Sequence, residues 1–238
     1  NDYSNNLIIH TYMMSSITQQ NNHAAVLIEK GLYKEALSSL SKALSQVQRE
    51  LNEADERNEE EQAVGSAESY IINTCHEHER EAMSTCLVEK LEPNQDFIYR
   101  HPIKTSEIPK QEESYVMSVI LVFNMALAHH LIGISQDDEA SNGERLRGAL
   151  KLYELVFCMQ MKSDVYMSMT CTLALVNNSA QIYKAINRER KAQKYFGHLL
   201  SSLMIVVEKG EAENLDELEG FLWNASRLIL TQQAAPAA

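Results

Sequence analysis

Basic residues are scarce in this sequence, where 21 lysines and arginines stand against 33 aspartates and glutamates over 238 residues. The formal charge of -12 at pH 7 makes phosphate backbones and anionic lipid surfaces poor partners, because binding to either depends on clustered basic side chains. One stretch is a candidate for a local basic patch: Lys184, Arg188, Arg190, Lys191 and Lys194. We therefore expect a protein or peptide partner, no nucleic acid and no membrane.

Cysteine is also sparse, and its spacing is not that of a disulfide framework. The four cysteines, at positions 75, 86, 158 and 171, form no Cys-x-x-Cys pair. We expect free thiols in a reducing compartment, with Cys158 and Cys171 as small core residues of helices. No basic-then-apolar leader opens the chain, so we expect no signal peptide and a location in the cytoplasm or the nucleus.

A long uninterrupted apolar run is missing as well. The longest apolar stretch, Met117 to Ile134, contains Ser118, Asn124, His129 and His130. It predicts a helix buried in protein and not a membrane span.

Signatures of catalysis are lacking. The sequence has no serine-centred elbow, no glycine-rich phosphate loop and no His-Glu-x-x-His motif, so we expect no enzyme, no cofactor and no small-molecule substrate. Zinc accepts two cysteines and two histidines, and one group offers them: Cys75, His76, His78 and Cys86. Its spacing matches no common zinc motif, and acidic residues surround it. A solvated polar helix is the preferred interpretation, with a metal-binding protein or enzyme as the weak alternative.

Helical periodicity is what the sequence does contain, most clearly in residues 18–47. Thr18 is a candidate N-cap for a helix that continues to Ile28 and ends at Gly31. A second helix begins near Tyr33 and spaces its apolar residues three and four apart: Ala36, Leu37, Leu40, Ala43, Leu44 and Val47. Two amphipathic helices joined by so short a turn must pack antiparallel, as a helical hairpin.

The pattern changes between residues 50 and 111. Seven acidic residues at 50–61 predict a helix end that passes into a flexible insert, with an acidic binding tail as the alternative. Residues 70–91 predict a weak helix, which Pro93 ends. Residues 97–103, Phe-Ile-Tyr-Arg-His-Pro-Ile, predict extended chain because aromatic residues alternate and proline disfavours the α region in the residue before it. We expect its aromatic side chains to lie across the helical body.

Five more helices are predicted in the second half of the chain. The first runs from Glu112 to about Ile132 and stops at Gly133, before a polar loop at 137–143. The others span 144–161, then Ser163-Asp164 as a cap to about residue 186, 188–207 before Gly210, and a closing helix at 214–230. Two predicted buried faces are Leu146, Ala149, Leu150, Tyr153, Val156 and Phe157, and Leu215, Leu218, Phe221, Leu222, Leu228 and Ile229. A disordered tail is expected at 234–238.

One arrangement of residues recurs three times, which decides the predicted fold class. An asparagine stands nine residues before each predicted turn, and an alanine follows each asparagine by two residues: Asn22 and Ala24 before Gly31, Asn124 and Ala126 before Gly133, and Asn178 and Ala180 before Asn187. Beyond the turns, an alanine precedes two large residues at four-residue intervals, starting at Ala36, Ala149 and Ala192. The second copy carries eleven extra residues, which we place in the polar loop.

This order at fixed offsets resembles the tetratricopeptide repeat (TPR) family, best in residues 22–44. Stretches 97–103, 123–130 and 218–230 make the whole sequence similar to TPR-like proteins of diatoms. The resemblance implies an all-α fold, a TPR-like α-solenoid of antiparallel helical hairpins with an acidic flexible insert. A single domain, 1–238, would contain repeat 1 (17–50), the acidic insert and extended strip (51–111), repeat 2 (112–163), repeat 3 (164–209) and the closing helix (214–230).

In that family the asparagine of the first helix faces a concave groove and holds the backbone of an extended peptide through its amide. The resemblance thus implies a peptide-binding groove formed by Asn21, Asn22, Asn124, Asn177, Asn178, Gln181 and Lys184. The alternative is that these side chains bond only to neighbouring helices. We expect a protein-interaction module or adaptor that binds a partner segment. A structural subunit, with permanent contacts through residues 97–103 and the helix around Trp223, is the second hypothesis.

Overall fold

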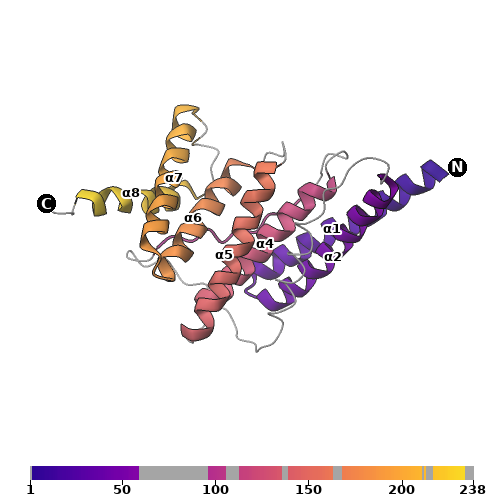
Figure 1. Cartoon of the computed structure of the whole chain (residues 1–238), viewed down its shortest axis with the longest axis horizontal. Helices are drawn as coiled ribbons and strands as arrows, with labels where there is room; N and C mark the ends of the chain where they lie inside the picture. Colours follow the sequence, from indigo (N-terminus) through magenta and orange to yellow (C-terminus); the bar gives the residue numbers. More distant parts are fainter. Residues whose placement is uncertain are drawn as a thin grey trace. The chain divides into compact units, whose positions relative to one another are not determined.

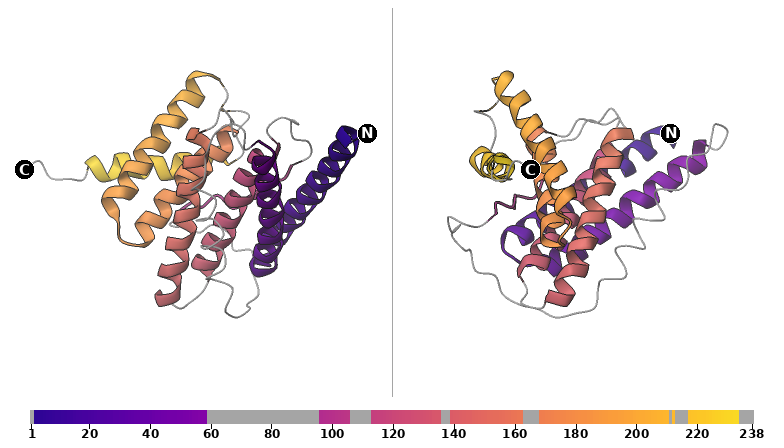
Figure 2. Two further views of the ribbon diagram at one scale, coloured as in Figure 1. Left: turned by 45° about the vertical axis from the view of Figure 1, so that its right-hand side comes forward. Right: turned by 60° about the vertical axis from the view of Figure 1, so that its left-hand side comes forward.

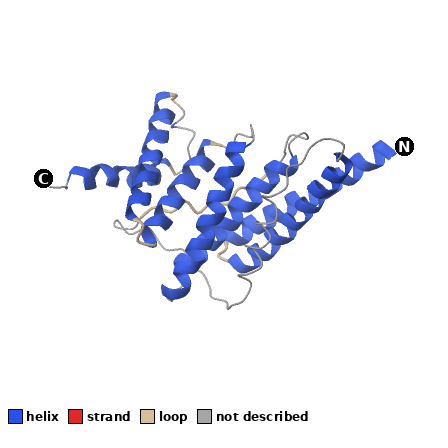
Figure 3. Ribbon diagram, in the orientation of Figure 1, coloured by secondary structure: helices blue, strands red, loops and turns tan. Residues whose placement is uncertain are grey.

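The computed structural model describes residues 2–58, 96–105, 113–135, 139–162, 168–210, 212 and 217–233. These residues contain seven α-helices and no β-strand (Figure 3). The predicted all-α class is therefore confirmed. Several predictions lie outside the described residues: the weak helix at 70–91, most of the flexible insert, the group of Cys75, His76, His78 and Cys86, and the tail at 234–238.

The chain divides into two compact units, described here in turn. Unit 1 comprises Asn1–Leu87 and Pro102–Ser135, and unit 2 comprises Val88–His101 and Gln136–Ala238. The boundary at residue 135 falls inside predicted repeat 2, and the division into three repeats stays a prediction. Unit 1 holds α1 (Asp2–Glu29), α2 (Tyr33–Asn58) and α4 (Glu113–Ser135), whereas unit 2 holds α5 (Glu139–Lys162), α6 (Met169–Ala185), α7 (Glu189–Glu208) and α8 (Leu218–Gln233) (Figure 1).

Unit 1 begins with the predicted helical hairpin, in which α1 and α2 pack side by side (Figures 1 and 2). The proposed N-cap at Thr18 is wrong, because α1 already starts at Asp2. No glycine or proline interrupts the helix between Asp2 and Thr18. The predicted end is correct. Gly31 adopts a φ of +75°, and the Leu32 amide donates to the Leu27 carbonyl over 2.9 Å, which closes the helix with a left-handed turn.

Helix α4 is the apolar core of unit 1 and packs against both α1 and α2. Its apolar stretch is long and apolar enough to cross a membrane, but 94% of that stretch is buried within the fold. The predicted stop at Gly133 is wrong, because α4 continues through this glycine to Ser135. A glycine inside a helix costs only about 1 kcal/mol relative to alanine, so a buried helix can retain one.

In unit 2, α5 begins earlier than predicted. Ser141, Asn142 and Gly143 are helical, so this part of the predicted polar loop is wrong, whereas residues 137 and 138 lie outside the described residues. The predicted buried face holds for all of its residues except Phe157, whose side chain is 51% exposed. Cys158, expected in the core, is exposed as well.

Helices α6 and α7 form the most extensive helix pair of unit 2, and α8 packs against α7. The Ser163-Asp164 cap is wrong, because Ser168 caps α6 by accepting a hydrogen bond from the Cys171 amide. Asn187 and Gly210, with φ of 58° and 69°, end α6 and α7 as predicted. In α8, Phe221 is buried as expected, but Leu222 is exposed.

Candidate functional site

Residues 96–105, which we call the clamped segment, are the part of the chain that the predicted asparagines bind within each unit. The segment lies in neither helix nor strand and runs as an extended zigzag (Figure 2, right), as predicted. Its first six residues belong to unit 2 and its last four to unit 1. An extended chain outside a sheet needs other partners for its amide and carbonyl groups. Asparagine side chains supply them at Phe97, Tyr99, Ile103 and Thr105.

In unit 2 the backbone of Phe97 is held by two asparagines. The Asn224 carboxamide accepts from the Phe97 amide at 3.1 Å and donates to the Phe97 carbonyl at 2.6 Å. Asn177 donates to the same carbonyl at 3.1 Å. The two side chains are also joined, because Asn224 donates to Asn177 Oδ1 at 2.6 Å. Each residue thereby fixes the orientation of the other.

Asn178 holds Tyr99 in the same two-bond manner. Its Oδ1 accepts from the Tyr99 amide at 3.0 Å and its Nδ2 donates to the Tyr99 carbonyl at 2.9 Å. Nδ2 also donates to the Tyr153 hydroxyl at 3.1 Å, and Oδ1 also accepts from Asn177 at 3.2 Å. All four hydrogen-bonding positions of the amide are therefore used. Burial raises the pKa of Tyr153 far above its ordinary value, so its phenol stays neutral.

Unit 1 builds the same arrangement on Ile103 and Thr105. Asn124 accepts from the Ile103 amide at 2.8 Å and donates to its carbonyl at 2.9 Å, and Asn21 donates to that carbonyl at 3.0 Å. Asn22 accepts from the Thr105 amide at 2.9 Å and donates to its carbonyl at 2.7 Å. Asn124 also donates to Asn21 Oδ1 at 2.9 Å.

Each unit thus carries a three-asparagine clamp with the same bonding pattern. The unit 1 clamp is Asn21, Asn22 and Asn124, and the unit 2 clamp is Asn177, Asn178 and Asn224. By this pattern Asn124 is equivalent to Asn224, whereas the sequence repeat grouped it with Asn22 and Asn178. Sequence reasoning did not place Asn224 in the site. A small residue two positions later, Ser226, was the available signal, since each predicted asparagine is followed by alanine at that position.

Side chains of the clamped segment also make specific contacts in unit 2. The Phe97 ring lies so close to Gly220 that a Cβ added there would stand 2.3 Å from it. Phe97 meets Phe221 edge to face, with ring centroids 5.2 Å apart, and Tyr99 stacks on the same Phe221 at 5.8 Å. Phe97 and Tyr99 are buried. Gly220 and Phe221 therefore form a seat for two aromatic rings at alternate positions.

Polar side-chain pairs flank these rings. Lys184 binds Asp96 at 2.6 Å, and Glu217 contacts the His101 ring at 3.0 Å, both within unit 2. In unit 1, Lys104 pairs with Glu29 at 2.7 Å. The pairs are partly or largely exposed, so each contributes modestly, about 0 to 1 kcal/mol.

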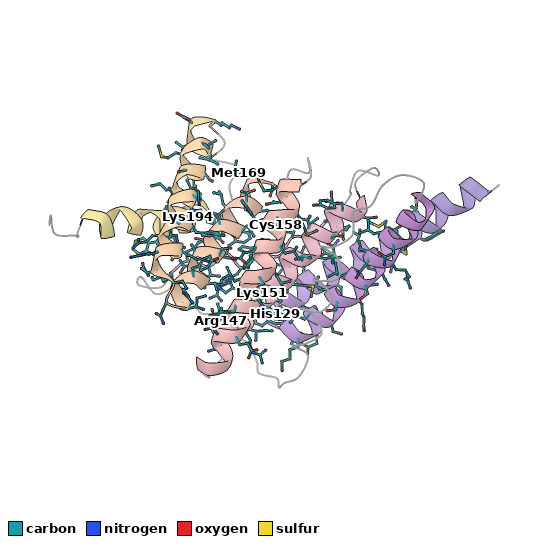
Figure 4. The ribbon with its side chains drawn as sticks, viewed as in Figure 1. His129, Arg147, Lys151, Cys158, Met169 and Lys194 are labelled. Atoms are coloured by element: carbon teal, nitrogen blue, oxygen red, sulfur yellow. The ribbon has the colours of Figure 1, made fainter. Side chains whose placement is uncertain are left out.

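Two further predicted features are only partly available for binding. Gln181 is buried beside the clamp on α6, and its Nε2 has no hydrogen-bond partner among the described residues. Two residues of the candidate basic patch already have partners within the chain. Lys184 is paired with Asp96, and Lys191 lies 5.0 Å from the centroid of the Tyr183 ring. Lys194 extends from α7 (Figure 4).

The described residues hold no group of three or more histidine, cysteine, aspartate or glutamate side chains that could bind a metal. Cys171 is buried, which raises the pKa of its thiol and disfavours the thiolate. Exposed Cys158 lies on α5 (Figure 4). The clamps are thus the strongest candidate site in the described parts of the chain.

Comparisons with models of protein families, with curated proteins and with solved structures found no match to this chain.

Proposed function

We propose that this chain is a protein-interaction module, built from TPR-like helical hairpins, which binds a partner segment in extended form through its asparagine clamps. The observation that supports this most is the repeated two-bond contact between an asparagine amide and the backbone of one residue, at Phe97, Tyr99, Ile103 and Thr105. A carboxamide donates and accepts at once, so it can satisfy both the backbone N–H and the backbone C=O of one residue.

The clamps favour an occupied site over an empty one. Five of the six clamp residues are buried: Asn21, Asn124, Asn177, Asn178 and Asn224. A buried amide without a hydrogen-bond partner lowers the free energy of unfolding by about 1 to 3 kcal/mol. The clamped segment therefore acts as the resident ligand, and a partner segment binds by taking its place. Because the bonds go to backbone atoms, the common requirement on the partner is an extended chain with free N–H groups at alternate residues.

A peptide with methylated backbone nitrogens tests this function. The receptor is the full-length chain with Phe97→Pro and Tyr99→Pro, which removes the two amides that the unit 2 clamp binds. Its circular dichroism and melting are compared with those of the wild type. The probe is a labelled, end-blocked peptide with the sequence of residues 95–102. We expect binding, and a loss of about tenfold or more when the nitrogen of the residue matching Phe97 or Tyr99 is methylated.

Methylation of the nitrogens matching Ile98 and Arg100 is the matched control, and we expect it to change affinity little. Equal losses at all four nitrogens, or no binding of the unmodified peptide to a folded receptor, would contradict the proposal.

A structural subunit is the second candidate, supported by apolar side chains that unit 2 leaves exposed on α7 and α8: Met204, Ile205, Val207, Leu222 and Trp223. Residues 97–103 engage their own chain, so the exposed helix faces are the surface that another subunit would cover. Light scattering of the purified chain distinguishes the two candidates. A monomer at micromolar concentration would count against obligate assembly.

A further inference from the structure

The unit 2 clamp carries side-chain contacts in addition to its backbone bonds, and these contacts define a preferred ligand sequence. The inference rests on the proposed function, because it concerns the segment that the clamp would bind. It starts from the residues that now occupy unit 2, Asp96 to His101.

The first aromatic position is the most constrained. Phe97 is 6% exposed, its ring covers Gly220, and Phe221 meets its edge. A flat ring uses the space that the missing side chain at Gly220 leaves, whereas a branched aliphatic side chain would lose the edge-to-face contact. An aromatic residue is therefore favoured at this position.

The second aromatic position follows two residues later. Tyr99 is 8% exposed and stacks on Phe221 with an interplanar angle of 17°. Its ring also meets the His101 ring at 5.4 Å. One phenylalanine of α8 thus contacts both rings, and it fixes their spacing at two residues.

Charges at the two ends set the direction of the ligand. Lys184 on α6 favours an acidic residue just before the first ring, where Asp96 stands, and Glu217, immediately before α8, favours a basic or histidine residue at the position of His101. The positions between are permissive, because Ile98 is half-buried and Arg100 is exposed. Reversing the ligand would place the acid against Glu217 and the base against Lys184.

We propose that unit 2 selects partner segments of the pattern acidic, aromatic, any, aromatic, any, basic, and that the chain's own Asp-Phe-Ile-Tyr-Arg-His occupies this site as a competing copy of the partner sequence. The partner is then a protein that presents this pattern in extended form. It competes with the clamped segment for Asn178 and Asn224.

Displacement by labelled peptides tests the pattern. The receptor is again the full-length chain with Phe97→Pro and Tyr99→Pro, and the reference peptide has the sequence of residues 95–102. Alanine at the first or second aromatic position should weaken binding by about 100-fold or more, which corresponds to removal of a buried aromatic side chain. Alanine at the position of Arg100 is the matched control and should change affinity by less than about twofold.

A charge exchange separates recognition from general stability. Lysine in place of the acidic residue should weaken binding about fivefold, and Lys184→Glu in the receptor should restore it for that peptide while weakening the reference peptide. Equal binding of all side-chain variants, with the methylation pattern intact, would overturn the sequence preference and leave the proposed function standing. No binding of any peptide would count against both.

A second receptor guards against a variant that fails to fold. Protease recognition sequences inserted at 88–95 and at 106–112 allow the segment to be cut out after the chain has folded. At equal peptide concentrations, labelled reference peptide should then replace more of the cut segment at equilibrium than the peptide with alanine at both aromatic positions. Equal extents of replacement would overturn the preference.

Discussion

The two clamps bond the backbone in the same way and treat the side chains differently. In unit 2 the clamped segment buries Phe97 and Tyr99 against Phe221, whereas in unit 1 the side chains of Ile103 and Thr105 are only half-buried. The shared part is a pair of asparagine bonds to the backbone of two residues in each unit, and it is independent of sequence. The part confined to unit 2 depends on sequence. In the proposed function, both clamps would therefore bind any extended backbone, and unit 2 would supply the selectivity.

The largest expected effect comes from removing the side chain that distinguishes unit 2. Phe97→Ala should lower the free energy of unfolding by about 3 to 5 kcal/mol, because it empties a buried space between Gly220 and Phe221. Ile103→Ala removes a half-buried side chain and should cost less than half as much. Urea unfolding of both variants measures the difference, and equal losses would remove the proposed contrast between the clamps.

The next effect compares equivalent asparagines. Asn178→Ala removes the amide that bonds to the Tyr99 backbone and the Tyr153 hydroxyl. It should lower the free energy of unfolding by about 3 kcal/mol. Asn22→Ala, at a half-buried position, should cost about 1 kcal/mol because water can replace the amide. Urea unfolding again provides the measurement. A larger loss at Asn22 than at Asn178 would contradict the account.

A glycine variant tests the close contact between Gly220 and the Phe97 ring. Gly220→Ala should destabilise the chain by about 1 to 3 kcal/mol through the clash with the Phe97 ring. Gly143→Ala on α5 is the control, since its nearest neighbour is an arginine side chain at 3.4 Å and alanine favours a helix. In a Phe97→Ala background the Gly220→Ala penalty should disappear. A penalty that persists there would mean that the ring is not its cause.

The smallest effect is a pH dependence from Tyr153. Because burial raises its pKa in the folded chain, the folded state keeps a proton that the unfolded state loses above its ordinary value of about 10. The contribution of Tyr153 to the free energy of unfolding is therefore fully present below pH 10 and falls as the pH rises, by about 1 kcal/mol at pH 11. Tyr153→Phe should reduce the fall in urea-unfolding free energy between pH 9 and pH 11. An unchanged pH slope would exclude Tyr153 as its source.

Local patterns made a good part of the fold predictable. The three- and four-residue spacing of Ala36, Leu40 and Leu44 identified α2, and Gly31 marked the turn before it because few other residues adopt a left-handed conformation easily. Pro102 and the alternating aromatics identified the extended segment. The failures were also local, since Gly133 and Ser141 stand inside helices although each residue type often ends one.

The clamps were only half predictable. Asn22, Asn124 and Asn178 stand out by their spacing, but the residue that each one binds lies about 20 to 80 positions away along the chain, and no helical period encodes such a pairing. Asn224 was missed because its copy of the pattern has serine in place of alanine and no predicted turn nine residues later. That the site holds its own chain follows from the three-dimensional structure alone.

Amide hydrogen exchange along the clamped segment, followed by NMR, tests the central claim most directly. The account predicts slow exchange for the amides of Phe97, Tyr99, Ile103 and Thr105, which donate to asparagine side chains, and fast exchange for those of Ile98, Arg100 and Lys104 between them. Uniform exchange across residues 97–105, whether fast or slow, would contradict it.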